Sequence, residues 1–319
     1  MGNIILGRNN SQLITDSRGK KYIRKYLVGN LSDVKRRLGN IEKFENIRTT
    51  LPDLNSPRLS GLDKSNNFVE HEWISEGVGL NELLEEDVDR FKKYIDSSMA
   101  AIAQVNNIVF ENKQANLEIG HTSPLIALST DEFSKSTGAE LELFALLQRD
   151  KLLIDSLKVH SSNAVLGYRH GDLRLDQLLI DPNGKLYIID FEEFSLGDVH
   201  TDLAGFIGSI VFKALLDTFS KAESEVNTSE EIDNYFVHKG NENLSNMKPL
   251  IVEAIDRYTY YSDKSINLEL LAVNVGWFII ERIISRSKFT YRLSNVDKAI
   301  AGVGRQSIVN PKLLMQLLG

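Results

Sequence analysis

Short apolar runs separated by polar turns dominate the first 75 residues. The turns are rich in Gly, Asn, Asp and Ser, as is typical of segments between strands. A longer stretch, Leu31–Leu51, has apolar residues three or four positions apart and predicts a helix with Ser32 as its N-cap. Four apolar runs predict strands: Ile4–Leu6, Gln12–Thr15, Lys21–Leu27 and Phe68–Ile74.

From Leu80 onward the apolar spacing is mostly helical. It predicts one helix at Asp87–Asn106, one or two helices within Asp131–Leu157, and a buried helix at Leu268–Ile284. The polar segment Ser220–Asn246, rich in Glu and Asn, is predicted to be a mobile insert or loop. A short hairpin with a Pro-Asn-Gly turn interrupts the helical pattern, and its two strands are Leu178–Ile180 and Leu186–Ile189.

These patterns predict an α+β chain with two lobes. A small β-rich N-terminal lobe, a sheet with one helix, would span residues 1–75, and a larger, mostly helical lobe would span residues 76–319. A chain of 319 residues is long enough to bury a substantial core in such an arrangement.

Composition excludes several classes of function. The sequence has no cysteine, so it has no disulfide, no Cys-ligated zinc and no cysteine nucleophile. A net charge of −7 argues against a nucleic-acid partner, and the charges within Leu268–Ile284 argue against a membrane span. The segment MGNIILGRNN has neither the basic nor the long apolar region of a signal peptide, which favours a cytoplasmic protein. No feature indicates an obligate protein partner.

The densest polar chemistry lies beside the hairpin. The sequence HGDLRLDQ, residues 170–177, precedes the first strand, and Asp190 follows the second. A hairpin of this length can bring Asp172 and Asp190 to one end of the strand pair. One carboxylate could orient a hydroxyl and accept its proton, while the other, with the amide oxygen of Gln177, could bind Mg²⁺, which prefers oxygen ligands. A base and metal ligands in this pattern indicate phosphoryl transfer.

Three motifs carry a resemblance to a known superfamily. HGDLRLDQ, IIDF and GDVHTDLA occur in the order and spacing of H-[GN]-D-[LI]-x-x-x-[NQ], I-D-[FW] and G-D-x-x-x-D-L-A. The chain thereby resembles the aminoglycoside phosphotransferase/choline kinase superfamily, over about residues 1–290 and most strongly over 168–206. The resemblance implies a bilobal protein-kinase-like fold, ATP and Mg²⁺ as cofactors, and transfer of the γ-phosphate to a hydroxyl of a small molecule.

The resemblance also implies roles for individual residues. Asp172 would orient the acceptor hydroxyl and accept its proton, while Gln177 and Asp190 would hold Mg²⁺. Arg174 would contact the γ-phosphate, or else form an ion pair with a neighbouring carboxylate. Most of the superfamily has Asn in place of Gln177. The Gln, together with Glu192 after the second motif, is similar to the maltokinase and glucosamine kinase branch.

The resemblance extends into the N-terminal lobe. In FVEHEWISEGVGLNELL the backbone of Glu72 and Ile74 would hydrogen-bond adenine, and LGRNNSQ occupies the place of a phosphate-covering loop. The strand KKYIRKYL offers the cation that contacts the nucleotide phosphates. Lys25 shares a strand face with apolar residues and is the first choice, with Arg24 as the alternative.

A kinase lysine of this kind is paired with a glutamate of the following helix. Glu45 falls on the apolar face of the predicted helix, where a carboxylate needs a partner, and Glu42 is the second choice. On the same analogy, His170 would hold the loop backbone and Asp202 would cap a helix and anchor the loop. Glu281 would be exposed or paired along its helix, or would bind an amine of the acceptor.

Two other functions remain open from the sequence. A non-catalytic nucleotide-binding pseudokinase is suggested by the single glycine in LGRNNSQ, although both Asp172 and Asp190 are retained. A protein kinase is disfavoured because no A-P-E element and no long activation segment follow Asp190. The acceptor of a small-molecule kinase would be an aminoglycoside, a sugar or amino sugar, or an amino alcohol.

Overall fold

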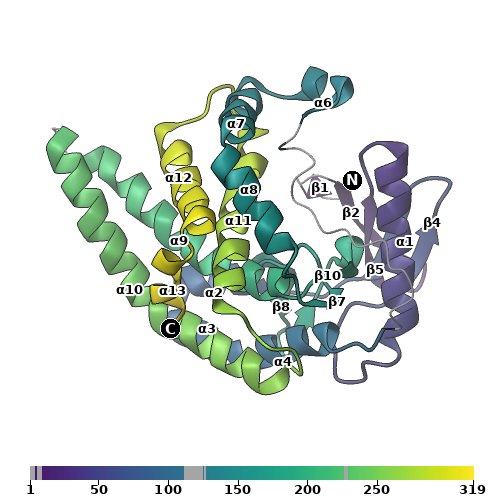
Figure 1. The fold of residues 1–319 in the computed structure, drawn as a ribbon. Helices are drawn as coiled ribbons and strands as arrows, with labels where there is room; N and C mark the ends of the chain where they lie inside the picture. The colour runs from purple at the N-terminus through teal and green to yellow at the C-terminus, as the bar shows by residue number, and fades with distance from the viewer. Residues whose placement is uncertain (1–3, 6–8, 111–124, 126, 226–228) are drawn as a thin grey trace.

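The computed structural model describes the chain except residues 1–3, 6–8, 111–124, 126 and 226–228, and it describes residues 4–5, 220–225 and 229–237 by their backbone alone. Figure 1 shows a β-rich N-terminal part beside a larger helical part. The α+β, bilobal, kinase-like fold class predicted from the sequence is therefore confirmed.

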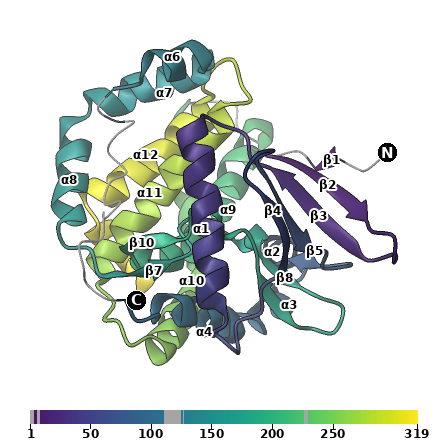
Figure 2. The same ribbon diagram turned by 90° about the vertical axis from the view of Figure 1, so that its right-hand side faces the viewer.

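The N-terminal part is a five-stranded antiparallel sheet with one helix beside it (Figure 2). Its strand order is β1-β2-β3-β5-β4. The strands are β1 (Ile4–Ile5), β2 (Asn10–Thr15), β3 (Lys21–Tyr26), β4 (Leu59–Asp63) and β5 (Phe68–Glu72). Each predicted strand has a counterpart, although Leu6 of the first lies outside the described residues. Strand β4 was not predicted, because LSGLD is short and contains Gly.

Helix α1 (Leu31–Arg48) begins two residues earlier than its predicted cap implies. Asn30, not Ser32, is the N-cap: its side-chain oxygen accepts hydrogen bonds from the Asp33 amide and from the Ser32 hydroxyl. A small core joins α1 to the sheet and consists of Leu27, Val34, Leu38, Ile41 and Val69.

The C-terminal part is built from helices that pack around α9 and α11 (Figure 1). Its described helices are α2 (Leu80–Glu86), α3 (Val88–Lys92), α4 (Ile95–Asn106), α6 (Thr130–Lys135), α7 (Gly138–Arg149), α8 (Lys151–Ser161), α9 (His200–Glu225), α10 (Ser229–Tyr261), α11 (Leu268–Ser287), α12 (Asn295–Val309) and α13 (Lys312–Leu318). Within the described residues, no helix has the length and apolarity needed to cross a membrane.

Three of the sequence predictions for this part were wrong. Asp87–Asn106 is two helices, α3 and α4, and the apolar pattern hides the break because Phe91 and Ile95 are both fully buried. Asp131–Leu157 falls in three helices, which begin at the capping residues Ser129, Thr137 and Asp150. The described residues of Ser220–Asn246 belong to α9 and α10 rather than to a loop, because the two helices pack along each other.

Two small sheets position the polar loop. Strands β7 (Leu166–Arg169) and β10 (Ser195–Asp198) form one antiparallel pair, and β6 (Val78–Gly79), β8 (Leu178–Ile180) and β9 (Leu186–Ile188) form the other sheet. The predicted hairpin is β8–β9, in which Leu178 pairs with Ile188. Residues 170–177 therefore connect β7 of the first sheet to β8 of the second, and Asp190 is two residues after the end of β9.

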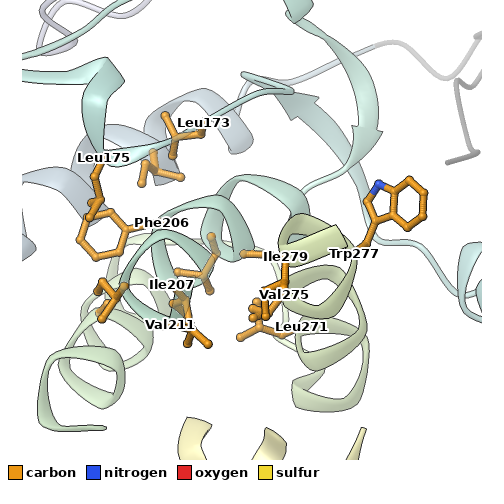
Figure 3. Packing of buried hydrophobic residues seen from close by; sticks show 14 of the residues in the cluster. Leu173, Leu175, Phe206, Ile207, Val211, Leu271, Val275, Trp277 and Ile279 are labelled. Carbon is orange, nitrogen blue, oxygen red and sulfur yellow. The ribbon is translucent and has the colours of Figure 1, made fainter. Parts of the chain in front are cut away.

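Apolar residues within the polar loop attach it to the helices. Leu173 and Leu175 are buried in the main hydrophobic core. Figure 3 shows Leu175 next to Phe206 of α9. The same figure shows the indole of Trp277, on α11, directed away from the other labelled side chains. These buried leucines anchor the backbone of the loop to the helical core.

Candidate active site

Asp202, in the first turn of α9, holds the backbone at the start of the polar loop. Its carboxylate accepts hydrogen bonds from the amides of His170 (2.8 Å) and Gly171 (3.0 Å) and from the side chain of Asn106 (3.0 Å). The expected anchoring role is confirmed, but the capping role is not. The side chain that accepts from the amide of His200, the first residue of α9, is that of Asp198, at 3.1 Å.

His170 is a structural residue of the loop, as predicted. Its Nε2 donates to the carbonyl of Ile189 at 2.8 Å, and its Nδ1 accepts from the amide of Asp172 at 3.4 Å. The ring therefore links the loop that carries Asp172 to the residue before Asp190. The candidate base and the candidate metal ligand are held at a set separation by one buried imidazole.

Asp172 lies between two arginines. Nη1 of Arg174 is 2.6 Å from one carboxylate oxygen, and Nη2 of Arg282, from α11, is 3.6 Å from the other. Arg174 also donates to Asp176 at 3.0 Å. Burial disfavours the charged guanidinium, but the two aspartates raise the pKa of Arg174. The ion-pair alternative for Arg174 is thus observed, and the contact of Arg282 with Asp172 was not predicted.

The side chain of Gln177 is buried without a hydrogen-bond partner. It is 2% exposed, and neither its amide oxygen nor its amide nitrogen is paired. Leaving such a group unpaired costs about 1–3 kcal/mol. The backbone carbonyl of Gln177 accepts from the Ile189 amide at 3.0 Å, which brings the residue close to Asp190. A buried amide oxygen that no protein donor satisfies suits a cation ligand.

Asp190 adopts a strained backbone conformation. Its φ of 71° and ψ of 56° lie in the left-handed region, which a non-glycine residue rarely occupies and which recurs at functional sites. Burial works against its charge, but the ammonium of Lys25 holds the pKa of Asp190 below its ordinary value. The turn directs the carboxylate away from the hairpin and toward the N-terminal sheet.

Lys25, rather than Arg24, faces this carboxylate. Its Nζ lies 2.7 Å from both carboxylate oxygens of Asp190 and 3.1 Å from Glu192. Burial lowers and the two carboxylates raise the pKa of Lys25, with a net increase. Arg24 is on the other strand face, where it pairs with Glu70 and stacks over Phe68.

The helix glutamates predicted to pair with Lys25 lie elsewhere. Glu45 accepts from Arg48, one turn further along α1, at 3.1 Å, and Glu42 pairs with Lys64 at 2.8 Å. The physical reason is the orientation of α1, whose Arg37, Asn40 and Phe44 face the 3₁₀ turn η2 (Phe191–Glu193).

The predicted adenine hinge follows β5. The Glu72 amide donates to the Arg58 carbonyl at 3.0 Å and its carboxylate pairs with Lys20, while Ile74 comes two residues after the strand. The binding role of Glu72 and Ile74 stays a prediction. In the phosphate-covering loop, residues 6–8 lie outside the described residues, and Asn9 donates to Glu192.

Two groups near the site have shifted pKa values that the sequence did not predict. Burial lowers the pKa of His71, on β5, to about 4, with the charge of Lys25 adding to the effect and that of Asp190 opposing it. Burial raises the pKa of Glu281, on α11, to about 7, and the charge of Asp172 adds to this. Glu281 is thus not an exposed residue, and no local sequence signal indicates its raised pKa.

The donor set fits a magnesium ion. In the described part of the chain, no group of three or more His, Cys, Asp or Glu side chains is arranged to hold a metal. Gln177 and Asp190 instead offer one amide oxygen and one carboxylate. Mg²⁺ is usually bound by one or two carboxylates, with water and substrate phosphates completing its octahedral shell.

Comparison with known proteins agrees with this architecture. A sequence profile of the phosphotransferase enzyme family matches residues 123–231, which include the polar loop and Asp190. Choline kinase LicA from Streptococcus pneumoniae has the same fold, with a TM-score of 0.56 and 14% identity over 97% of this chain and 92% of that chain. The resemblance to the aminoglycoside phosphotransferase/choline kinase superfamily is confirmed.

Two further structures share the fold. Plasmodium vivax ethanolamine kinase has a TM-score of 0.56 and 15% identity over 98% of this chain and 83% of that chain. Amicoumacin kinase hAmiN has a TM-score of 0.53 and 9% identity over 97% of this chain and 88% of that chain. No curated protein sequence gives a significant match. At these identities the likeness establishes the fold alone.

Proposed function

We propose that the protein is an ATP-dependent kinase that transfers the γ-phosphate to a hydroxyl of a small molecule. The observation that carries the proposal is the contact of Lys25 with Asp190 across the two lobes, with Asp172 tied to the residue before Asp190 through His170. Gln177 is bonded through its backbone to that same residue, Ile189. A cation, two oxygen ligands and a carboxylate base are the parts required for phosphoryl transfer. The lobes would be residues 1–75 and 76–319, with the nucleotide between them.

Lys25 would contact the α- and β-phosphates of ATP, and the backbone of Glu72 and Ile74 would hydrogen-bond adenine. Proteins of the same fold support a nucleotide: LicA has been solved with AMP, and hAmiN with AMP-PNP and Ca²⁺. Gln177 and Asp190 would hold Mg²⁺, which neutralises negative charge on the phosphates when bound. The unpaired oxygen of Gln177 supports this assignment.

Asp172 would orient the acceptor hydroxyl and accept its proton. Arg174 and Arg282 hold its carboxylate from two sides, so the oxygens are already oriented before the acceptor arrives. Arg174 would also reduce the repulsion between Asp172 and the transferred phosphate, since it is 2.6 Å from Asp172.

The acceptor would be an aminoglycoside, a sugar or an amino sugar, or an amino alcohol. Glu281 on α11 supports an acceptor with a basic group, because the charge of Asp172 acts on Glu281 and a cation would be attracted to both carboxylates. The protein would need no nucleic acid, membrane or obligate protein partner, and would work in the cytoplasm.

A screen of ATP consumption by the purified protein over these acceptor classes, with Mg²⁺ present, tests the proposal. We expect turnover with at least one class, and at least a 100-fold lower kcat in Asp172→Asn with nucleotide affinity retained. Asp176→Asn, which removes the other carboxylate beside Arg174, is the matched control.

The second candidate is a nucleotide-binding pseudokinase, favoured by one observation: both Lys25 and Asp172 are engaged in ion pairs. Stabilisation by ATP and Mg²⁺ without phosphate transfer to any acceptor would support it and overturn the kinase assignment.

A further inference from the structure

We propose that Glu192 is the residue that positions Lys25, in place of a glutamate on helix α1. The inference rests on the proposed function, because Lys25 is there the cation that contacts the nucleotide phosphates. Glu192 is a positioning residue in this assignment. It acts on the nucleotide only through the ammonium that it holds.

The first observation is the contact between the two side chains. Oε2 of Glu192 lies 3.1 Å from Nζ of Lys25, and the Glu192 side chain is 8% exposed. Asp190 also contacts Lys25, but Asp190 is a proposed metal ligand. Glu192 is the carboxylate that can hold the ammonium without also serving the metal.

The second observation is that Glu192 is itself held from the N-terminal lobe. Asn9 donates to both of its carboxylate oxygens, at 3.3 and 3.2 Å, and Nη1 of Arg37 lies 3.5 Å from Oε2. Arg37 is fully buried and also donates to the carbonyl of Val28 at 2.6 Å. A carboxylate with several donors has one preferred position, and so does the lysine that it contacts.

The third observation is that one face of α1 packs against the η2 turn. Arg37 approaches the Glu192 side chain, Asn40 donates to the Glu192 carbonyl at 3.0 Å, and Phe44 stacks on Phe191 with ring centroids 3.5 Å apart. These residues are three, four and seven positions apart, which places them on one side of a helix. Helix α1 therefore restricts the position of Lys25 indirectly, through its contacts with η2.

The lysine's partner comes from a different element than the resemblance implies. A helix glutamate would reach Lys25 directly, whereas here the helix contributes a cation, Arg37, and the glutamate comes from the turn after the metal-binding aspartate. Lys25, Glu192 and Arg37 form an alternating row of charges, 3.1 and 3.5 Å apart. Loss of the central carboxylate would leave two cations facing each other.

The test compares Glu192→Gln with Glu45→Gln. Gln keeps the length of the side chain and removes its charge. We expect Glu192→Gln to raise the KM for ATP and lower kcat by about tenfold or more, with an unchanged KM for the acceptor. The Glu45→Gln variant should show the smaller effect, and Glu193→Gln, in the same turn but paired with Arg36, should resemble the wild type.

A second measurement does not depend on turnover. Mass spectrometry can follow how fast an amine-reactive reagent labels Lys25. We expect several-fold faster labelling in Glu192→Gln, because the ammonium loses one of its two carboxylates, and no change in Glu45→Gln. If Glu192→Gln does not fold, Glu192→Asp, which keeps the charge but retracts it, should show the same ranking in milder form.

The two measurements test the positioning role of Glu192 separately from the kinase assignment. Faster labelling in Glu192→Gln together with no phosphate transfer by the wild type would retain the positioning role and reject the kinase. An active wild type in which Glu45→Gln impairs ATP use and Glu192→Gln does not would overturn the positioning role and retain the kinase.

Discussion

The ammonium of Lys25 lies 2.7 Å from both carboxylate oxygens of Asp190, so one ion pair joins the N-terminal sheet to the hairpin of the helical part. The two residues are 165 positions apart in the sequence. Glu192 shares the same ammonium, and a strained backbone at Asp190 directs its side chain toward it.

Removing the shared cation should destabilise the protein. In Lys25→Met, Asp190 and Glu192 lose the cation that they share, and we expect the free energy of unfolding to fall by about 2 kcal/mol in urea titrations at pH 7. Adding Asp190→Asn should recover part of this loss, because it removes the repulsion. Lys64→Met, which breaks an exposed pair with Glu42, should change the value by less than about 1 kcal/mol. Equal effects of the two lysine variants would contradict the buried ion pair.

Gln177→Leu should separate function from stability. The substitution removes two buried polar atoms that have no hydrogen-bond partner, so the free energy of unfolding should stay the same or rise by about 1 kcal/mol. The Mg²⁺ concentration needed for half-maximal activity should rise at least tenfold, since a ligand is lost. Gln177→Asn, which keeps a shorter amide, should give an intermediate value. A destabilised Gln177→Leu with unchanged Mg²⁺ dependence would show that the amide is structural.

His71 should limit stability in acid. Its pKa is lowered from 6.5 to about 4, so the unfolded chain binds a proton more readily than the folded protein. The contribution of the neutral ring is fully present above pH 6.5 and is lost as the pH falls toward 4. His71→Phe should remove this loss, worth up to about 3 kcal/mol, in unfolding curves measured from pH 7 to pH 4. His238→Gln, at an exposed position, is the control and should follow the wild-type profile.

Ionisation of Glu281 should lower the stability of the folded protein as the pH rises from 4.5 toward 7. Its pKa is raised from 4.5 to about 7, so the folded protein retains the proton that the unfolded chain releases. The contribution is present below pH 4.5 and is lost as the pH rises through 7. Glu281→Gln should therefore become more stable than the wild type between pH 5 and pH 8, by up to about 3 kcal/mol. Glu269→Gln, exposed on the same helix, serves as the reference, and parallel profiles of the two variants would reject a buried Glu281.

The sequence by itself determined the fold class, the β8–β9 hairpin and the loop residues Asp172, Gln177 and Asp190 as candidates for chemistry. These features are local: period-two and helical spacing, turn residues, and polar residues at set distances along the chain are visible in one segment. The preference for Lys25 over Arg24 also came from a local rule, because strand side chains alternate between faces.

The tertiary structure alone decided which charges meet. Glu45 was a reasonable partner for Lys25 from helical spacing, but the rotation of α1 against η2 presents Arg37, Asn40 and Phe44 instead. The approach of Arg282 to Asp172 and the burial of Glu281 depend on how α11 packs beside the loop. Side-chain pairing across more than a hundred residues depends on the angle and rotation of packed elements, and a pattern along one segment does not contain them.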